Sequence, residues 1–184
     1  VSALCGSLAA ALAEMVGNLT LGRRGCDDAQ ESIREALAEL EEIRTILLKA
    51  IDEDSESFNG FMAALKMPKN TEEEKVLRKT AMSQALKTAS LVPLKVAGQS
   101  VRIFKFSRLM LERGNKNAAT DAMVSALAAR TAAIGALLNV RINLRVIHDP
   151  EFVRTTLEEV LRLETLTNEQ EKEITEIGYQ LLNQ

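Results

Sequence analysis

Histidine, cysteine and tryptophan are nearly absent from this sequence, and each shortage removes a class of site. The only histidine, His148, has no second histidine to share a metal ion with, and the two cysteines, Cys5 and Cys26, lack metal-ligand spacing. We therefore expect no metal site. Two cysteines form no disulfide framework, which favours a reducing compartment such as the cytoplasm, and we interpret both as small apolar side chains. His148 is interpreted as a helix cap.

Proline, glycine and aromatic residues are also scarce. Three prolines and nine glycines leave little material for turns, and no glycine-rich loop that could hold a phosphate is present. An apolar content of 46% with only 3% aromatic residues fits a helical protein rich in alanine and leucine. We predict an all-α fold, an antiparallel multi-helix bundle around a buried central helix, as a single domain over residues 1–184.

Neither acidic nor basic side chains are in large excess. The chain has 23 basic and 26 acidic side chains, a net charge of −3, so nothing attracts nucleic acid or an anionic membrane to the whole surface. The opening run Val1–Leu21 is apolar, but it has no basic leader and carries Glu14 near its centre. We predict that it forms a buried helix, and we expect neither nucleic acid nor a membrane as partner.

The segment from Asn117 to His148 is the predicted central helix. It has no carboxylate between Asp121 and Asp149, so it is apolar on nearly every side. One stripe of this helix is nevertheless small and polar. Two interpretations stay open, because such a stripe suits close helix packing or the wall of a ligand site, and buried polar groups need partners. The stripe contains Asp121, Ser125, Ala128, Ala132, Gly135, Ala136, Asn139 and Asn143.

Local signals delimit the other helices. The first is expected over Ser2–Thr20, with a leucine-rich side and a glycine-alanine side that both pack. A second begins near Ala29 and continues until Pro68 forbids it. Arg23 and Arg24, in the turn between these two helices, suit either capping and solubility or the binding of an anion.

Two further helices complete the prediction. The third spans Glu72–Arg113, because Thr71 and Glu74 form a capping box and Gly114 suits the residue after a helix. Pro93 predicts a kink or a break near Leu91. Asp149-Pro150 starts the last helix, which continues to about Leu182 with a candidate interruption at Thr167-Asn168.

Asp54 is the first candidate for chemistry. On a helical wheel it falls within the apolar face of the second helix, whereas Asp52, Glu53 and Glu56 point elsewhere. A carboxylate aimed at the core either retains a proton, as acid/base chemistry requires, or pairs with a cation such as Arg130 or Arg141. Periodicity does not separate these alternatives. The apolar face consists of Ile33, Leu40, Ile43, Leu47, Ile51, Phe58, Phe61 and Leu65.

Several segments occur together in an order and spacing typical of one family. They are Met15-Val16-Gly17 with Gly22-Arg23-Arg24, Asp52-Glu53-Asp54 through Phe58, Met67-Pro68-Lys69-Asn70-Thr71-Glu72-Glu73-Glu74-Lys75, Val92-Pro93-Leu94, Gly114-Asn115 with Asp121, and Leu138-Asn139-Val140-Arg141-Ile142-Asn143-Leu144. Nearly the whole chain thereby resembles the cyclodeaminase domain of formiminotransferase-cyclodeaminase and its stand-alone relatives, which include methenyltetrahydrofolate cyclohydrolases. Such relatives usually carry a glycine-rich segment before the position of Val1, and we expect it to be missing here.

The resemblance implies a homodimeric helical bundle that binds a tetrahydrofolate, with one or several glutamates, and needs no cofactor. The implied enzyme is a lyase of one-carbon metabolism and histidine catabolism, which converts 5-formiminotetrahydrofolate to 5,10-methenyltetrahydrofolate and ammonia. A methenyltetrahydrofolate cyclohydrolase with the same pocket is the alternative, and a non-enzymatic helical scaffold is a remote one.

The resemblance also assigns site residues. It places the catalytic carboxylate on Asp54. We hypothesise that Asp121, Asn139 and Asn143 hold the pterin or the tetrahedral carbon and that Lys69 and Arg23 receive the glutamate tail. Asn115 is a further expected substrate-binding residue.

Overall fold

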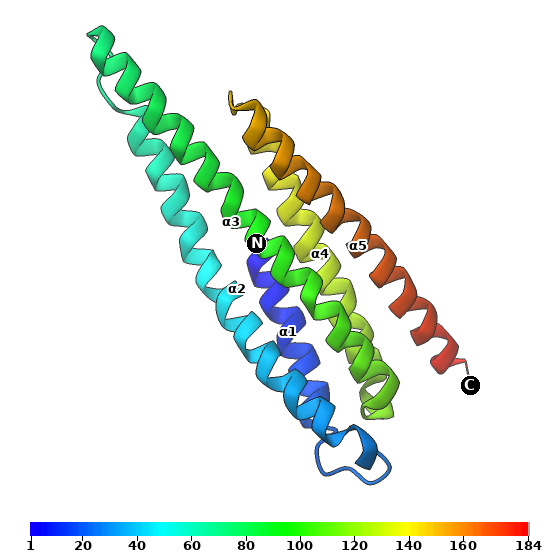
Figure 1. Ribbon diagram of the computed structural model, residues 1–184. Coiled ribbons are helices and arrows are strands. Elements are labelled where there is room, and N and C mark those ends of the chain that lie inside the picture. Colours follow the sequence, from blue (N-terminus) through cyan, green and yellow to red (C-terminus); the bar gives the residue numbers. More distant parts are fainter. Residues whose placement is uncertain (184) are drawn as a thin grey trace.

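Residues 1–183, the part of the chain that the computed structural model describes, form five α-helices and no strand (Figure 1). This confirms the all-α prediction. The helices are α1 (Ser2–Asn18), α2 (Gln30–Leu65), α3 (Glu72–Arg113), α4 (Ala119–Leu144) and α5 (Pro150–Leu182), and single 3₁₀ turns precede α2 (η1, Asp27–Ala29) and α4 (η2, Lys116–Ala118).

The predicted starts of α3 and α5 are confirmed by their side-chain hydrogen bonds. At the start of α3, the Thr71 hydroxyl accepts the Glu74 backbone N–H, and the Glu74 carboxylate accepts the Thr71 N–H. At the start of α5, Asp149 Oδ1 accepts the N–H of Phe152 at 3.1 Å. A hydrogen bond from Lys87 of α3 helps to hold the pKa of Asp149 below its ordinary value, so this cap also ties α5 to α3.

Two predictions are wrong, the interruption of α5 and the end of α4, and of the kink or break predicted near Leu91 the break is absent. The helix α3 continues through Pro93, and α5 continues through Thr167, whose hydroxyl donates to the Leu163 carbonyl at 2.7 Å. The helix α4 ends at Leu144, four residues before His148. His148 is exposed in the turn that follows, so it does not cap α4.

The helix α1 packs through its small side only. Ala9, Ala10 and Ala13 are fully buried, and Gly6 lies so close to Leu47 of α2 and Ser100 of α3 that a Cβ would meet both within 3.0 Å. The leucine side faces solvent instead, with Leu4 57% and Leu8 56% exposed. Packing of the small side is confirmed, and packing of the leucine side stays a prediction.

The helix α4 packs against α1, α3 and α5, whereas α3 contacts all four other helices. The Ser125 hydroxyl of α4 donates to the Ala9 carbonyl of α1 at 2.7 Å and lies 2.8 Å from the Ser107 hydroxyl of α3. One apolar face of α4 remains open, however, with Leu138 61% and Ile142 58% exposed. The stretch Lys116–Leu144 is long and apolar enough to cross a membrane by composition alone, a property that core helices of other bundles share.

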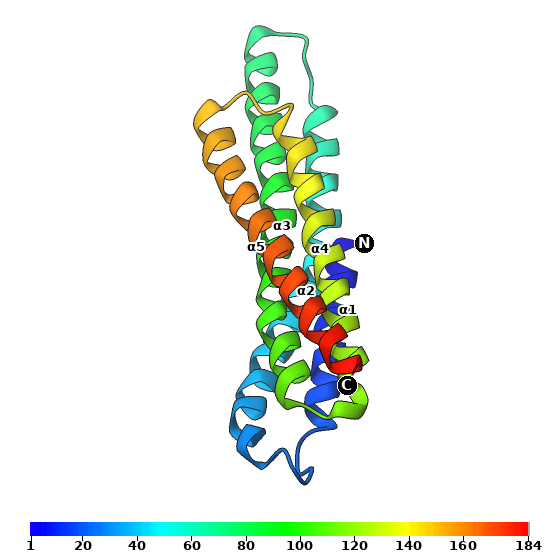
Figure 2. The ribbon, with the colours of Figure 1, turned by 90° about the vertical axis from the view of Figure 1, so that its right-hand side faces the viewer.

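The helices differ in length, and this difference shapes the molecule. In the region of α1, the helices α2 and α4 lie at opposite corners, and α1 and α3 each contact both of them. The hairpin of α2 and α3 extends well past the start of α1 (Figures 1 and 2). Beyond Ser2, α2 and α4 therefore face each other across α3 without α1 between them.

Candidate active site

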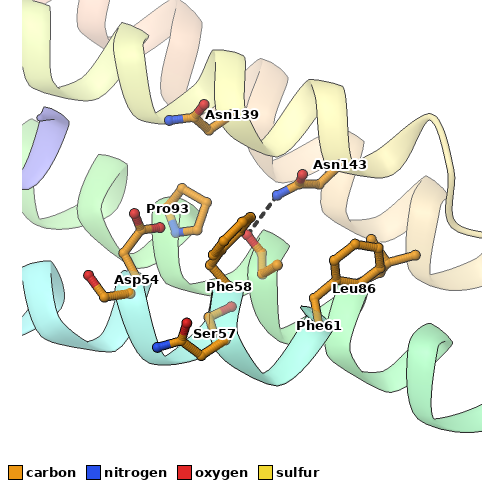
Figure 3. Close-up of a pocket in the computed structure, with 11 residues that line it drawn as sticks. Asp54, Ser57, Phe58, Phe61, Leu86, Pro93, Asn139 and Asn143 are labelled. Carbon is orange, nitrogen blue, oxygen red and sulfur yellow. Dashed lines mark hydrogen bonds between the residues drawn. The ribbon is translucent and has the colours of Figure 1, made fainter. Parts of the chain in front are cut away.

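A groove of about 530 Å³ lies where α2 and α4 flank α3 beyond the start of α1 (Figure 3). One wall is α2 and the other is α4, and α3 contributes the floor. The side chains that line it are Asp54, Ser55, Ser57, Phe58, Asn59, Phe61, Leu86, Ala89, Pro93, Asn139 and Asn143. A smaller cavity of about 170 Å³ adjoins it and shares Asp54, Ser55, Pro93 and Asn139.

Asp54 lies on the α2 wall with its carboxylate toward the groove (Figure 3). The side chain is exposed, so the predicted placement in the core is wrong. Beyond Ala50, where α2 leaves the neighbourhood of α1, only Ser57 and Ala64 of α2 are buried, and the side that carries Asp54 is open. Direction on a helical wheel says where a side chain points, but not which neighbour covers it.

The carboxylate of Asp54 is free of partners among residues 1–183. Arg130 and Arg141, the expected partners, pair instead with Glu171 and Glu164 of α5. The neighbouring Glu53, in contrast, accepts a hydrogen bond from Lys95 at 2.9 Å. Of these two adjacent acids, only Asp54 can offer its full proton and hydrogen-bonding capacity to a ligand.

Asn139 and Asn143 extend from α4 toward the opposite wall (Figure 3). Asn143 Nδ2 donates to the Ala89 carbonyl of α3 at 2.8 Å. Pro93 has no N–H to give that carbonyl, so Asn143 supplies the missing donor and helps α3 to continue. Asn139 is exposed, and its side chain makes no hydrogen bond with any residue that the structure describes.

The polar stripe of α4 packs closely against other helices over one part of its length and lines the groove over another part. Ser125, Ala132 and Ala136 are fully buried against neighbouring helices, as close packing requires. Beyond the start of α1, Asn139 and Asn143 of the same stripe line the groove.

No site role was predicted for three other residues that line the groove, Ser57, Phe58 and Phe61. The Ser57 hydroxyl is buried without a hydrogen-bond partner among the described residues, which is rare in proteins. Phe58 keeps 62% of its surface exposed. A usable signal was spacing, because Phe58 follows Asp54 by four residues and must share its side of the helix.

A family model described as formiminotransferase-cyclodeaminase matches residues 1–162. The chain belongs to this family. It is 35% identical over 159 residues to a methenyltetrahydrofolate cyclohydrolase from Methylorubrum extorquens, which covers 86% of this chain and 76% of that protein. It is 36% identical over 163 residues to the formimidoyltransferase-cyclodeaminase of Gallus gallus, of which it spans only 30%.

The fold leads to the same family. A crystal structure of formiminotetrahydrofolate cyclodeaminase from Thermotoga maritima superimposes with a TM-score of 0.88 at 28% identity, over 99% of this chain and 87% of that chain. The resemblance inferred from the motifs is thus confirmed. The chain is a member of a group of folate-processing enzymes of one-carbon metabolism.

Four residues assigned through the family resemblance lie outside the groove. Asp121 is 18 residues before Asn139 on α4, which is about 27 Å along a helix. Asn115 lies at that far end too, where its side chain accepts the N–H of Asn117. Arg23 lies in the loop after α1, also at the far end, whereas Lys69 lies in the α2–α3 turn beyond Phe61. Their substrate-binding roles stay predictions.

Metal-ligating side chains do not gather in the groove. No group of three or more histidine, cysteine, aspartate or glutamate side chains that could hold a metal ion occurs within residues 1–183. The expectation of a metal-free site stays a prediction.

Proposed function

We propose that this chain is a formiminotetrahydrofolate cyclodeaminase, an ammonia-releasing lyase of folate one-carbon metabolism and histidine catabolism. Family membership and the Thermotoga maritima likeness support the proposal. The observation that carries it is the unpaired carboxylate of Asp54 in a groove of about 530 Å³.

The proposed reaction needs one group that takes a proton and returns it. The substrate enters with its formimino group protonated, as an amidinium. N10 of 5-formiminotetrahydrofolate attacks the formimino carbon, and the new tetrahedral carbon joins N5, N10 and an amino nitrogen. Asp54 takes the proton that N10 loses and delivers a proton to the amino nitrogen. Ammonia leaves, and the 5,10-methenyl cation remains. This proton transfer contributes about 10²- to 10⁴-fold to the rate, and positioning of N5 and N10 between α2 and α4 contributes further.

The Asp54→Asn substitution tests this role. It keeps the shape of the side chain and removes the proton carrier, so we expect kcat for ammonia release to fall by about 10²- to 10⁴-fold with little change in folate affinity. Asp52→Asn is the matched control, because Asp52 is exposed on the same helix turn but lines no cavity. Near-normal turnover in the Asp54 variant would remove Asp54 from the mechanism.

A cyclohydrolase is the second candidate, and the 35% identity to the Methylorubrum extorquens enzyme favours it. Hydrolysis of a methenyl bridge also passes through a tetrahedral carbon between N5 and N10, so the same groove and carboxylate serve both reactions. Assays of ammonia release from 5-formiminotetrahydrofolate and of 5,10-methenyltetrahydrofolate hydrolysis, on one preparation, distinguish the two by their kcat/KM values.

A non-enzymatic scaffold is disfavoured, because it predicts an Asp54 paired to arginine and no polar hollow. A thermal shift with folinic acid separates it from an enzyme, since a ligand that binds the native state raises the melting temperature. We further propose a cytoplasmic homodimer that needs neither metal nor cofactor and has no nucleic-acid or membrane partner.

A further inference from the structure

We infer that Phe58 stacks against the p-aminobenzoyl ring of the bound folate and thereby sets the direction in which the folate lies. The pterin then points toward Ser2 and Asn139, and the glutamate tail points toward the α2–α3 turn with Lys69. This inference rests on the proposed folate substrate.

The first support is the position of Phe58 relative to Asp54. The two residues are four apart on α2, so their side chains lie on one side of the helix with an axial separation of about 6 Å. Figure 3 shows the Phe58 ring projecting from α2 toward α4, between Asp54 and Phe61. In a folate, N10 is bonded directly to the p-aminobenzoyl ring. A carboxylate that serves N10 therefore has a flat aromatic ring about one helical turn away.

The second support is the exposure of Phe58. An aromatic ring that is 62% exposed in a groove leaves apolar surface that a flat ligand ring would cover. Stacked rings are favourable beyond the area that they bury. The chain has only five phenylalanines, and two of them, Phe58 and Phe61, line this groove.

The third support is that the two ends of the groove differ in chemistry. The smaller cavity, beside the start of α1, presents the polar side chains Ser2, Ser55 and Asn139, which suit the donor and acceptor edge of a pterin. In the other direction the groove presents Phe61 and Leu86. The α2–α3 turn beyond them carries the exposed Lys66 and Lys69, which suit carboxylates of a glutamate tail.

The test compares Phe58→Ala with Phe58→Tyr. The dissociation constant is measured by calorimetry for folinic acid, for p-aminobenzoyl-L-glutamate and for 6-methyltetrahydropterin, with weak ligands measured by competition. We expect Phe58→Ala to weaken folinic acid and p-aminobenzoyl-L-glutamate by about tenfold or more, and the pterin by less than about threefold. Phe58→Tyr should keep all three within about threefold, because it retains the ring.

Leu48→Ala is the control, because Leu48 is 43% exposed on the same helix but lines neither the groove nor the smaller cavity. If Phe58→Ala weakens the pterin alone, or no ligand at all, the inference is overturned. If Phe58→Ala changes the oligomeric state in sedimentation, Phe58 belongs to a subunit contact and the inference is also overturned. If the unmodified protein neither binds folinic acid nor turns over a folate, the proposed function itself has failed.

Discussion

Asn139 and Asn143 are one helical turn apart on α4, yet hydrogen bonding gives their side chains different tasks. The Asn143 amide is committed to the Ala89 carbonyl, which Pro93 leaves without its helical donor. The Asn139 amide faces both cavities without a partner among the described residues. At the scale of single residues, Asn143 supports the floor of the groove and Asn139 is free for a ligand.

We expect Asn143→Ala to lower the free energy of unfolding by about 1 kcal/mol, because the Ala89 carbonyl loses its donor. Urea unfolding followed by circular dichroism measures the change. Asn139→Ala should alter stability by less than about 0.5 kcal/mol while weakening folinic acid binding. Equal stability of the two variants would contradict this division of tasks.

Among the helix elements, the end of α3 depends on one residue, Gly114, which has no space for a side chain. Its φ of −83° suits any residue, so backbone conformation does not require glycine here. Close approach does require it, because a Cβ at Gly114 would lie 2.3 Å from the Met110 carbonyl oxygen. That oxygen is backbone and accepts the Gly114 N–H, so it cannot move aside while the end of α3 is kept.

We expect Gly114→Ala to lower the free energy of unfolding by about 1–3 kcal/mol, because the last turn of α3 must distort. Gly98→Ala is the matched change inside α3, where a Cβ would meet nothing within 4 Å. It should raise stability by about 0.5–1 kcal/mol, since alanine favours a helix over glycine. Thermal unfolding of both variants measures the effect, and a stabilising Gly114→Ala would show that α3 can end differently.

Exposed apolar side chains line α1 and α4, two helices that pack side by side (Figure 2), and we call these side chains the α1–α4 face. Large exposed apolar patches mark interaction sites in proteins. The face gathers Leu4, Leu8, Met15, Leu19, Val124, Leu127, Leu138 and Ile142, none less than 40% exposed. This surface supports the proposed homodimer, because a second copy would cover it.

We expect Leu8→Glu to convert a dimer into a monomer without unfolding it, because a charge would be buried in the contact but not in the free chain. Light scattering after size exclusion measures the mass, and circular dichroism checks the fold. Thr80→Glu, on an exposed position of α3, should leave the dimer intact. A monomeric unmodified protein would disprove the dimer, and a dimeric Leu8 variant would exclude this face.

Structural features were predicted correctly where the interacting residues are close in the sequence, and were missed where they lie on different helices. The Thr71–Glu74 box and the Asp149 cap involve neighbours within four residues, and both starts were predicted correctly. The end of α4 was placed four residues too late, because the segment Arg145–His148 contains no glycine or proline that would mark the end of a helix. The break expected at Pro93 is absent, because the Asn143 side chain donates the hydrogen bond that Pro93 cannot give. Asn143 lies on another helix, so no local pattern around Pro93 could predict this.

The helical fold, the starts of α3 and α5 and the family could all be predicted from the amino-acid sequence. They depend on local hydrogen bonds, periodicity and the order of motifs along the chain. Tertiary structure alone decided that Asp54 lines an open groove, with Asn139 across from it and Asp121 far away. The physical reason is that a helical wheel gives a direction and not a neighbour. Burial depends on where α1 begins beside α2 and α4, and only the packed helices show that.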